Sequence, residues 1–269
     1  MNIHVDNPQK TEAGLRISTD SGILTIRIDN PGRLNAWTTS IRAQLVLVLN
    51  EAAQAETVRA AVITGQGAAF CAGQDLNEQA SWSPEVDQMD SFEAVYEAVL
   101  RFPKPLVAAI EGPAVGSGMQ LALLCDLRVA STSARIGQTE VRWGMPSVTG
   151  TWLLERTVGP TRARTLALSS RVVEGYELKT LGLVDELVSP ELVLDLARDR
   201  ARELAELPVA SFEMTKRYCF EAQESAFRMA FEAARRLHRE SSLLGHELAG
   251  AERFLRKTDH AKETTRNDS

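Results

Sequence analysis

Hydrophobic and polar positions along the chain predict strands and helices that alternate through its first two thirds. Runs of apolar and β-branched residues predict strands at 22–29, 58–64, 106–110, 127–130 and 134–137. Apolar residues spaced three to four positions apart predict helices at 38–55, 91–102 and 118–124. Helices that alternate with buried strands are typical of α/β proteins, so we expect this fold class.

The last third of the chain has a different, helical pattern. Helical periodicity covers residues 191–205, the segment 206–208 (ELP) interrupts it, and a longer helical stretch runs to about Leu244. We therefore predict a core of residues 1–190 and a helical C-terminal region of residues 191–269. A helical tail after an α/β core suggests a lid, an oligomerisation element, or both.

Composition and charge exclude several classes of protein. The chain has 269 residues, of which 44% are hydrophobic and 25% charged, as in ordinary folded proteins. Its net charge of -6 argues against a nucleic-acid-binding protein, which usually has a basic surface. The chain has no apolar run near the roughly eighteen residues that suggest a membrane span, and no apolar stretch typical of a signal peptide.

The three cysteines, Cys71, Cys125 and Cys219, cannot all pair within the chain, and their spacing matches no zinc motif. We expect reduced thiols in a cytoplasmic protein, and no metal site.

Two glycine-bearing turns each follow a predicted strand. They are residues 70–76 (FCAGQDL) and residues 114–120 (AVGSGMQ), the second of which opens a helix. Glycine lets the backbone approach a ligand closely, and a helix N-terminus supplies amide donors and a partial positive charge. Each turn alone is better explained by tight packing, and neither is a phosphate loop or a dinucleotide fingerprint. Side by side, the two turns could bind one developing oxyanion.

With these turns the chain resembles the crotonase (enoyl-CoA hydratase/isomerase) family. The similar segments are 30–36 (NPGRLNA), 70–76 (FCAGQDL), 111–118 (EGPAVGSG), 124–128 (LCDLR), 182–185 (GLVD) and 254–257 (FLRK). The resemblance implies a crotonase-like spiral of ββα units with a helical C-terminal region. It also implies an acyl-CoA thioester as substrate, no permanently bound cofactor, and a homotrimer or a dimer of trimers.

The resemblance assigns roles to particular residues of this sequence. The oxyanion-hole donors fall on the backbone N–H groups of Gln74 and Ser117, and contacts to CoA fall on Arg33, Ala72 and Lys257. Ser117 departs from the more usual glycine, so its side chain fills space near the thioester oxygen. Arg33 and Lys257 are almost as well explained as solvated surface cations.

The acid/base position departs from the pattern of the family's hydratases, which use two glutamates. Glu140 matches the second glutamate, whereas Gln120 stands at the first. An amide has no titratable proton near neutral pH, and this argues against efficient addition of water. Glu140 as the single acid/base suits proton transfer between carbons, as in the family's enoyl-CoA isomerases. Gln120 is explained equally well by a substrate contact and by a structural hydrogen bond.

Two alternatives to this reaction remain open. Gln and Glu at these positions are also similar to the carboxymethylproline synthases, so the enolate could form a C–C bond or arise by decarboxylation. A non-catalytic acyl-CoA-binding protein fits less well, because Glu140 is retained. Asp75 is better explained as a brace of its loop than as a base, and His238 as a structural or exposed residue. The wall of the acyl pocket is expected from residues 77–90.

Overall fold

The computed structural model describes residues 13–80, 89–246 and 249–250. Its main sheet has six strands in the order β1-β2-β3-β4-β6-β9. They are β1 (Gly14–Asp20), β2 (Ile23–Asp29), β3 (Ala60–Gly65), β4 (Leu106–Ile110), β6 (Leu127–Ser131) and β9 (Glu186–Val188). Strands β1 and β2 pair antiparallel, and the other neighbours pair parallel. Strands β3 and β4 are buried along their whole length, which explains their apolar sequences.

A smaller sheet brings together three segments that are separated in the chain. Its strands, in the order β5-β7-β8, are β5 (Pro113–Val115), β7 (Arg135–Gly137) and β8 (Val172–Glu174). An isolated bridge between Cys71 and Ala114 ties the turn at 70–76 to β5. The backbone N–H of Gly116 continues the pairing of β5 with β7, because it donates to the carbonyl of Gly137 at 2.9 Å. The segments that follow β5 and β7 therefore start side by side.

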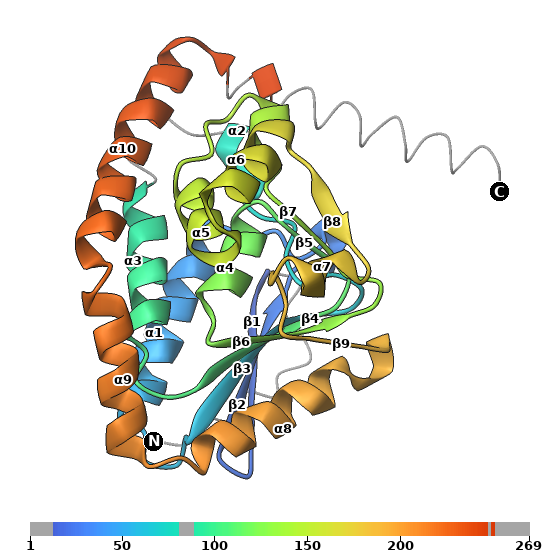
Figure 1. Cartoon of the computed structure of the whole chain (residues 1–269), viewed down its shortest axis with the longest axis vertical. Helices are drawn as coiled ribbons and strands as arrows, with labels where there is room; N and C mark the ends of the chain where they lie inside the picture. Colours follow the sequence, from blue (N-terminus) through green and yellow to red (C-terminus); the bar gives the residue numbers. More distant parts are fainter. Residues whose placement is uncertain (1–12, 81–88, 247–248, 251–269) are drawn as a thin grey trace, which may run out of the picture.

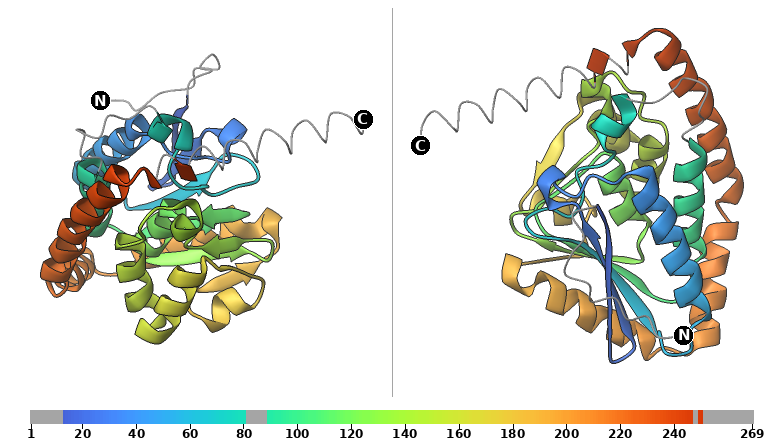
Figure 2. Two further views of the ribbon diagram at one scale, coloured as in Figure 1. Left: turned by 90° about the horizontal axis from the view of Figure 1, so that it is seen from above. Right: turned by 180° about the vertical axis from the view of Figure 1, so that it is seen from behind.

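Helices cover both faces of the main sheet (Figure 1, Figure 2). They are α1 (Thr39–Gln54), α2 (Leu76–Ala80), α3 (Met89–Arg101), α4 (Ser117–Leu124), α5 (Thr149–Val158), α6 (Pro160–Ser169), α7 (Glu177–Thr180), α8 (Val193–Ala205), α9 (Val209–Glu221) and α10 (Glu224–Leu243). Helix α8 packs on one face of β3, β4 and β6, where Val62, Ala109 and Ala197 belong to one apolar cluster. The opposite face carries the larger core, to which α1, α3, α4 and α5 contribute. The sheet is thus a central layer.

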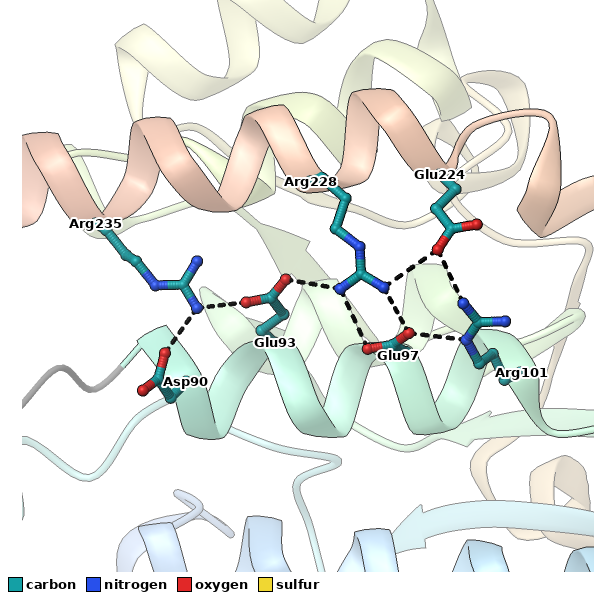
Figure 3. Close-up of polar contacts among 7 residues, drawn as sticks. All are labelled: Asp90, Glu93, Glu97, Arg101, Glu224, Arg228 and Arg235. Atoms are coloured by element: carbon teal, nitrogen blue, oxygen red, sulfur yellow. Dashed lines mark hydrogen bonds and ion pairs between the residues drawn. The ribbon is translucent and has the colours of Figure 1, made fainter.

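Helix α10 lies along α3, as Figure 3 shows. Arg228 of α10 forms ion pairs with Glu93 at 3.0 Å and Glu97 at 2.8 Å, and Arg235 pairs with Asp90 at 2.7 Å and with Glu93. Single exposed pairs contribute about 0–1 kcal/mol, but a linked network of this kind fixes the register between two helices. Helix α10 is therefore held in one position relative to α3.

The α/β class and most of the predicted elements are confirmed, and the short elements α2, α7, β5, β8 and β9 had not been predicted. The long helical stretch predicted to reach Leu244 consists of two helices, because residues 222–223 are not helical and separate α9 from α10. Helices α5 and α6 had not been predicted. Strand β1 had not been predicted either, because it is a largely exposed, polar edge strand with little apolar signal. The division of the chain at residue 190 stays a prediction.

Within residues 13–80, 89–246 and 249–250, no helix combines the length and the apolar character that crossing a membrane requires.

Candidate active site

A cavity of about 720 Å³ opens between the two glycine-bearing turns, α3, the start of α5 and α10. Six residues that the resemblance assigned to the site line this cavity: Arg33, Ala72, Gln74, Ser117, Gln120 and Glu140. Lys257, the seventh, lies outside the described residues, as does much of the segment 77–90 that was expected to wall the acyl pocket. The structure thus brings together every assigned residue that it describes.

The turn at 30–36 is held by the two asparagines of its motif. Asn35 is fully buried and donates from Nδ2 to the carbonyls of Gln66 at 2.9 Å and Ala69 at 2.7 Å. Asn30 donates from Nδ2 to the carbonyl of Ala36 at 2.8 Å. Because these bonds fasten the turn to the loop before residue 70, the motif positions the first glycine-bearing turn.

The two glycine-bearing turns touch each other at Gly73. A Cβ atom added to Gly73 would lie 2.9 Å from the carbonyl oxygen of Val115 and 3.4 Å from the backbone nitrogen of Ser117. Gly73 also has a φ of +91°, which side chains rarely adopt. The backbone nitrogen of Ser117 begins α4, so helix geometry gives its N–H no partner inside the helix. The amide of residue 117 and the turn that contains residue 74 therefore share one end of the cavity.

Trp37 forms hydrogen bonds to both glycine-bearing turns. Its N–H donates to the carbonyl of Gly73 at 2.9 Å, and its carbonyl accepts from the N–H of Asp75 at 3.3 Å. Its indole Nε1 donates to Oγ of Ser117 at 2.8 Å. The buried Trp37 thus fixes the side chain of Ser117, the first residue of α4.

Glu140 is the first residue of a short 3₁₀ helix (Glu140–Trp143), which two residues separate from the end of β7. The residue is half-buried, and its Oε2 atom is buried without a hydrogen-bond partner among the described residues. Burial raises the pKa of the carboxyl to about 7, although hydrogen bonds from two backbone amides and from Gln120, and the electrostatic effect of His238, oppose the shift. Gly116, with a φ of +57°, leaves room here, because an added Cβ would lie 3.3 Å from Oε1.

Gln120 holds the other oxygen of the same carboxyl. Its Nε2 donates to Oε1 of Glu140 at 3.0 Å. Its own Oε1 accepts from the hydroxyl of Tyr96 at 2.8 Å and from that of Thr149 at 2.8 Å. Two donors on the amide oxygen leave only the NH₂ group to face Glu140. The network therefore fixes the orientation of the amide and leaves Oε2 of Glu140 without a hydrogen-bond partner among the described residues.

Asp75 is a second carboxylate in the same cavity, in a different environment. It is 1% exposed and accepts from Arg33 at 2.5 Å and from the backbone and side chain of Asn77 at 2.9 and 3.1 Å. Burial acts to raise its pKa, but the hydrogen bonds from Arg33 and Asn77 outweigh burial and lower it. Asp75 thus braces its loop, as expected from the sequence.

Sequence reasoning missed several residues that line the cavity. Tyr96 and Thr149 orient Gln120, His238 on α10 lies close enough to affect the charge of Glu140, and Gln138 lines the wall. The inward spacing of Tyr96 on its amphipathic helix was a weak signal. His238 had been expected as a structural or exposed residue, and its role at the cavity was not foreseen.

Trp143 also lines the cavity, whereas Trp152 packs its ring edge-on against Phe227 at 5.7 Å. In the described part of the chain, no three His, Cys, Asp or Glu side chains are grouped to hold a metal ion.

Comparisons with known proteins identify the class that this fold and cavity define. A model of the enoyl-CoA hydratase/isomerase family matches residues 18–263. The chain is 31% identical over 245 residues to the 1,2-epoxyphenylacetyl-CoA isomerase of Escherichia coli K12, covering 88% of this chain and 94% of that protein. It is 32% identical over 244 residues to the 2,3-dehydroadipyl-CoA hydratase of the same strain, covering 90% and 96%.

Solved structures agree with these relatives. OdaA of Pseudomonas aeruginosa superposes with a TM-score of 0.82 at 28% identity, covering 89% of this chain and 98% of that chain. An enoyl-CoA hydratase of Bacillus anthracis gives 0.73 at 26% identity, covering 82% and 88%. The chain belongs to the enoyl-CoA hydratase/isomerase (crotonase) family, and the predicted crotonase-like fold is confirmed. It is an acyl-CoA enzyme of that family.

Proposed function

We propose that the protein moves a proton between carbons of an enoyl-CoA thioester, as an enoyl-CoA isomerase does. One observation carries the proposal: Glu140 lines the cavity, and its Oε2 atom is buried without a hydrogen-bond partner among the described residues. The carboxyl has a pKa of about 7, so near neutral pH it can both accept and return a proton.

The proposed reaction has two steps. Oε2 of Glu140 takes a proton from C2 of a 3-enoyl thioester, and the C–H electron pair moves onto the thioester oxygen to form a dienolate. The backbone N–H groups of Gln74 and Ser117 stabilise this oxyanion, and loss of one such donor costs about 2.7–4 kcal/mol of barrier. Glu140 then returns the proton at C4, the double bond moves to C2–C3, and the carboxylate is regenerated.

Gln120 supports proton transfer rather than addition of water. Its amide cannot act as a second acid or base near neutral pH, and its NH₂ is committed to Oε1 of Glu140 at 3.0 Å. Hydration would need a water molecule activated by one group and a proton delivered by another. Because Glu140 is the titratable member of the Gln120–Glu140 pair, taking up one proton and returning it to another carbon is the simpler chemistry.

The remaining assignments complete the proposal. Arg33 and Ala72 lie at the cavity, where they would contact the CoA portion, and Lys257 would contribute a further cation from outside the described residues. Helix α10 would act as a wall of the cavity through His238, which is one of the two roles expected for the helical region. A homotrimer or a dimer of trimers, with no permanently bound cofactor, stays part of the proposal.

Hydration is the second candidate, because one relative at 32% identity is named a hydratase. Carbon–carbon bond formation or decarboxylation through a malonyl-type enolate is the third, supported by the Gln120–Glu140 pair alone.

One set of incubations separates these reactions. The protein is incubated in D₂O with 3-enoyl-CoA, 2-enoyl-CoA and malonyl-CoA, and products are followed by mass spectrometry and release of CO₂. We expect isomerisation and deuterium at C2 or C4, and their absence from wild type contradicts the proposal. Dominant 3-hydroxyacyl-CoA or CO₂ would favour the second or third candidate.

Two matched variants complete the experiment. Glu140→Gln should abolish isomerisation and exchange while acyl-CoA still binds. Glu111→Gln is the control, because burial also raises the pKa of Glu111, yet this residue does not line the cavity. Tight acyl-CoA binding without turnover, unchanged in Glu140→Gln, would indicate a binding protein instead.

A further inference from the structure

Gln138 is a buried glutamine whose amide has no hydrogen-bond partner among the described residues. It lies between β7 and Glu140, is 1% exposed and lines the cavity. Neither Nε2 nor Oε1 reaches a donor or acceptor in the described part of the chain. Native proteins rarely leave a buried amide unpaired, so this side chain points to a ligand or a bound water. The mechanism above makes no use of it.

Packing against α5 fixes the position of this amide. A Cβ added to Gly150, in the first turn of α5, would lie 2.1 Å from Nε2 and 2.4 Å from Oε1 of Gln138. The amide therefore lies directly over the Cα of Gly150, in space that any other residue would fill. This arrangement holds the two polar atoms in place instead of leaving them free to turn to another partner.

The segment that leads into α5 contributes a third unpaired polar atom. Oγ of Ser147 is buried without a partner among the described residues, and Ser147 lines the cavity. Helix α5 spans ten residues and begins after Val148, with no side chain capping its first amides. A helix N-terminus of this length adds N–H donors and a partial positive charge. The polar wall formed by Gln138, Ser147 and the amino end of α5 therefore offers both donors and an acceptor.

These donors and acceptors select among acyl groups. A plain alkyl chain would leave every atom of the polar wall unpaired, at a cost in affinity. A carboxylate would satisfy the donors but not Oε1 of Gln138, and it would share the cavity with the carboxyl of Glu140. A hydroxyl group both donates and accepts, so it can satisfy the two ends of the Gln138 amide together.

We propose that the polar wall binds a hydroxyl group on the acyl chain, so that the substrates are hydroxylated acyl-CoA thioesters. This inference rests on the proposed function in that the cavity receives the acyl group of a CoA thioester. The hydroxyl lies beyond the carbons that exchange protons, because those carbons must face Oε2 of Glu140. Gln138 then determines specificity and takes no part in proton transfer.

Binding of saturated esters tests the inference without any chemistry. Hexanoyl-CoA and its 5- and 6-hydroxy derivatives are titrated into the full chain by isothermal calorimetry. We expect at least one hydroxy ester to bind about tenfold more tightly than hexanoyl-CoA, the effect of one or two added hydrogen bonds. Gln138→Met keeps a similar volume without the amide and should remove this preference, while Ser147→Ala should reduce it.

The matched control is Gln44→Met, which alters a half-buried glutamine away from the cavity and should keep the preference. Equal binding of hexanoyl-CoA and all hydroxy esters by wild type would overturn the inference, since the polar wall would then hold an ordered water only. A preference that survives in Gln138→Met would overturn it as well.

Two further readouts separate this inference from other failures. Thermal unfolding of Gln138→Met should show no loss of stability, because the removed atoms have no partner among the described residues; a lower midpoint would indicate a structural, water-bound amide and count against the inference. Failure of proton exchange with a retained hydroxyl preference would sink the proposed function alone, and the reverse result would sink the hydroxyl subsite alone.

Discussion

Asp75 and Glu140 are two carboxylates that line one cavity, yet their surroundings shift their pKa values in opposite directions. Asp75 is buried but receives hydrogen bonds from Arg33 and Asn77, and its pKa is lowered. Glu140 receives one side-chain hydrogen bond, from Gln120, and its pKa is raised to about 7. Burial alone therefore does not mark the acid/base. A buried carboxyl with too few hydrogen-bond donors is the better candidate for the acid/base. Asp75 therefore braces its loop, whereas Glu140 is able to exchange a proton.

The pH dependence of turnover gives the largest test of this contrast. Proton abstraction needs ionised Glu140, so the rate should rise with pH and level off above about 7. At pH 5, two units below that pKa, the rate should be about 100-fold lower than at pH 8. Initial rates of 3-enoyl-CoA isomerisation between pH 5 and 9 measure it. A flat profile over this range would contradict Glu140 as the base.

Gln120→Glu changes the environment of Glu140, because it replaces the amide that lies 3.0 Å from Oε1 of Glu140 with a second carboxyl. Two carboxyls at this distance cannot both ionise readily, so the pair should hold one proton near neutral pH. We expect hydration of 2-enoyl-CoA to rise about 10–100-fold, because the variant then has both an acid and a base. Formation of 3-hydroxyacyl-CoA is the measurement. An unchanged rate would show that the geometry, and not only the amide, excludes water addition.

The two carboxylates should also affect stability with opposite signs. Glu140 has a higher pKa folded than unfolded, so the folded state binds the extra proton and stability falls as pH rises from about 4.5 to 7. At pH 8 Glu140→Gln should therefore stabilise the protein by about 1–3 kcal/mol, and this gain should vanish near pH 5. Asp75 has a lowered pKa and stabilises the folded state above its unfolded pKa.

Asp75→Asn is thus the counterpart, and at pH 8 it should destabilise the protein by about 1–2 kcal/mol. Urea unfolding of wild type and both variants at pH 5 and pH 8 measures the two effects. Changes of the same sign at pH 8 would mean that the two environments do not differ as described.

Local sequence chemistry explains what could be predicted before the structure. The turn at 30–36, the two glycine-bearing turns and Glu140 were predictable, because each depends on residue types that one backbone geometry requires. The pairing of Gln120 with Glu140 was not, since it needs Tyr96 and Thr149, 24 and 29 residues away in the chain. The pKa of Glu140 likewise depends on burial in the folded chain and on His238, 98 residues further along, and no local pattern encodes either.

The same distinction applies to the fold. Buried strands such as β4 were predicted from apolar runs, whereas exposed β1 depends on pairing with β2 for its existence. Helices α9 and α10 share a continuous helical pattern in the sequence. The interruption at residues 222–223 could not be predicted, because it goes with the packing of α10 alongside α3.

The smallest predicted effect concerns the two hydroxyls that orient Gln120. Tyr96→Phe and Thr149→Val each remove one donor to Oε1 of Gln120, and each should slow isomerisation by about two- to tenfold, the effect of one hydrogen bond. In the double variant the amide is free to turn and place its oxygen beside Glu140. Glu140 would then lose a donor and gain a repulsive neighbour, so its pKa should rise further.

The pH–rate profile separates this effect from a general loss of structure. The acid limb should move to higher pH in the double variant, whereas a merely destabilised protein would lose rate at every pH. Thr157→Val is the matched control, because Thr157 also lies on α5 but its hydroxyl donates to the carbonyl of Leu153 at 2.9 Å. If the double variant keeps the wild-type profile, the orientation of Gln120 does not set the pKa of Glu140, and the contrast with Asp75 rests on burial alone.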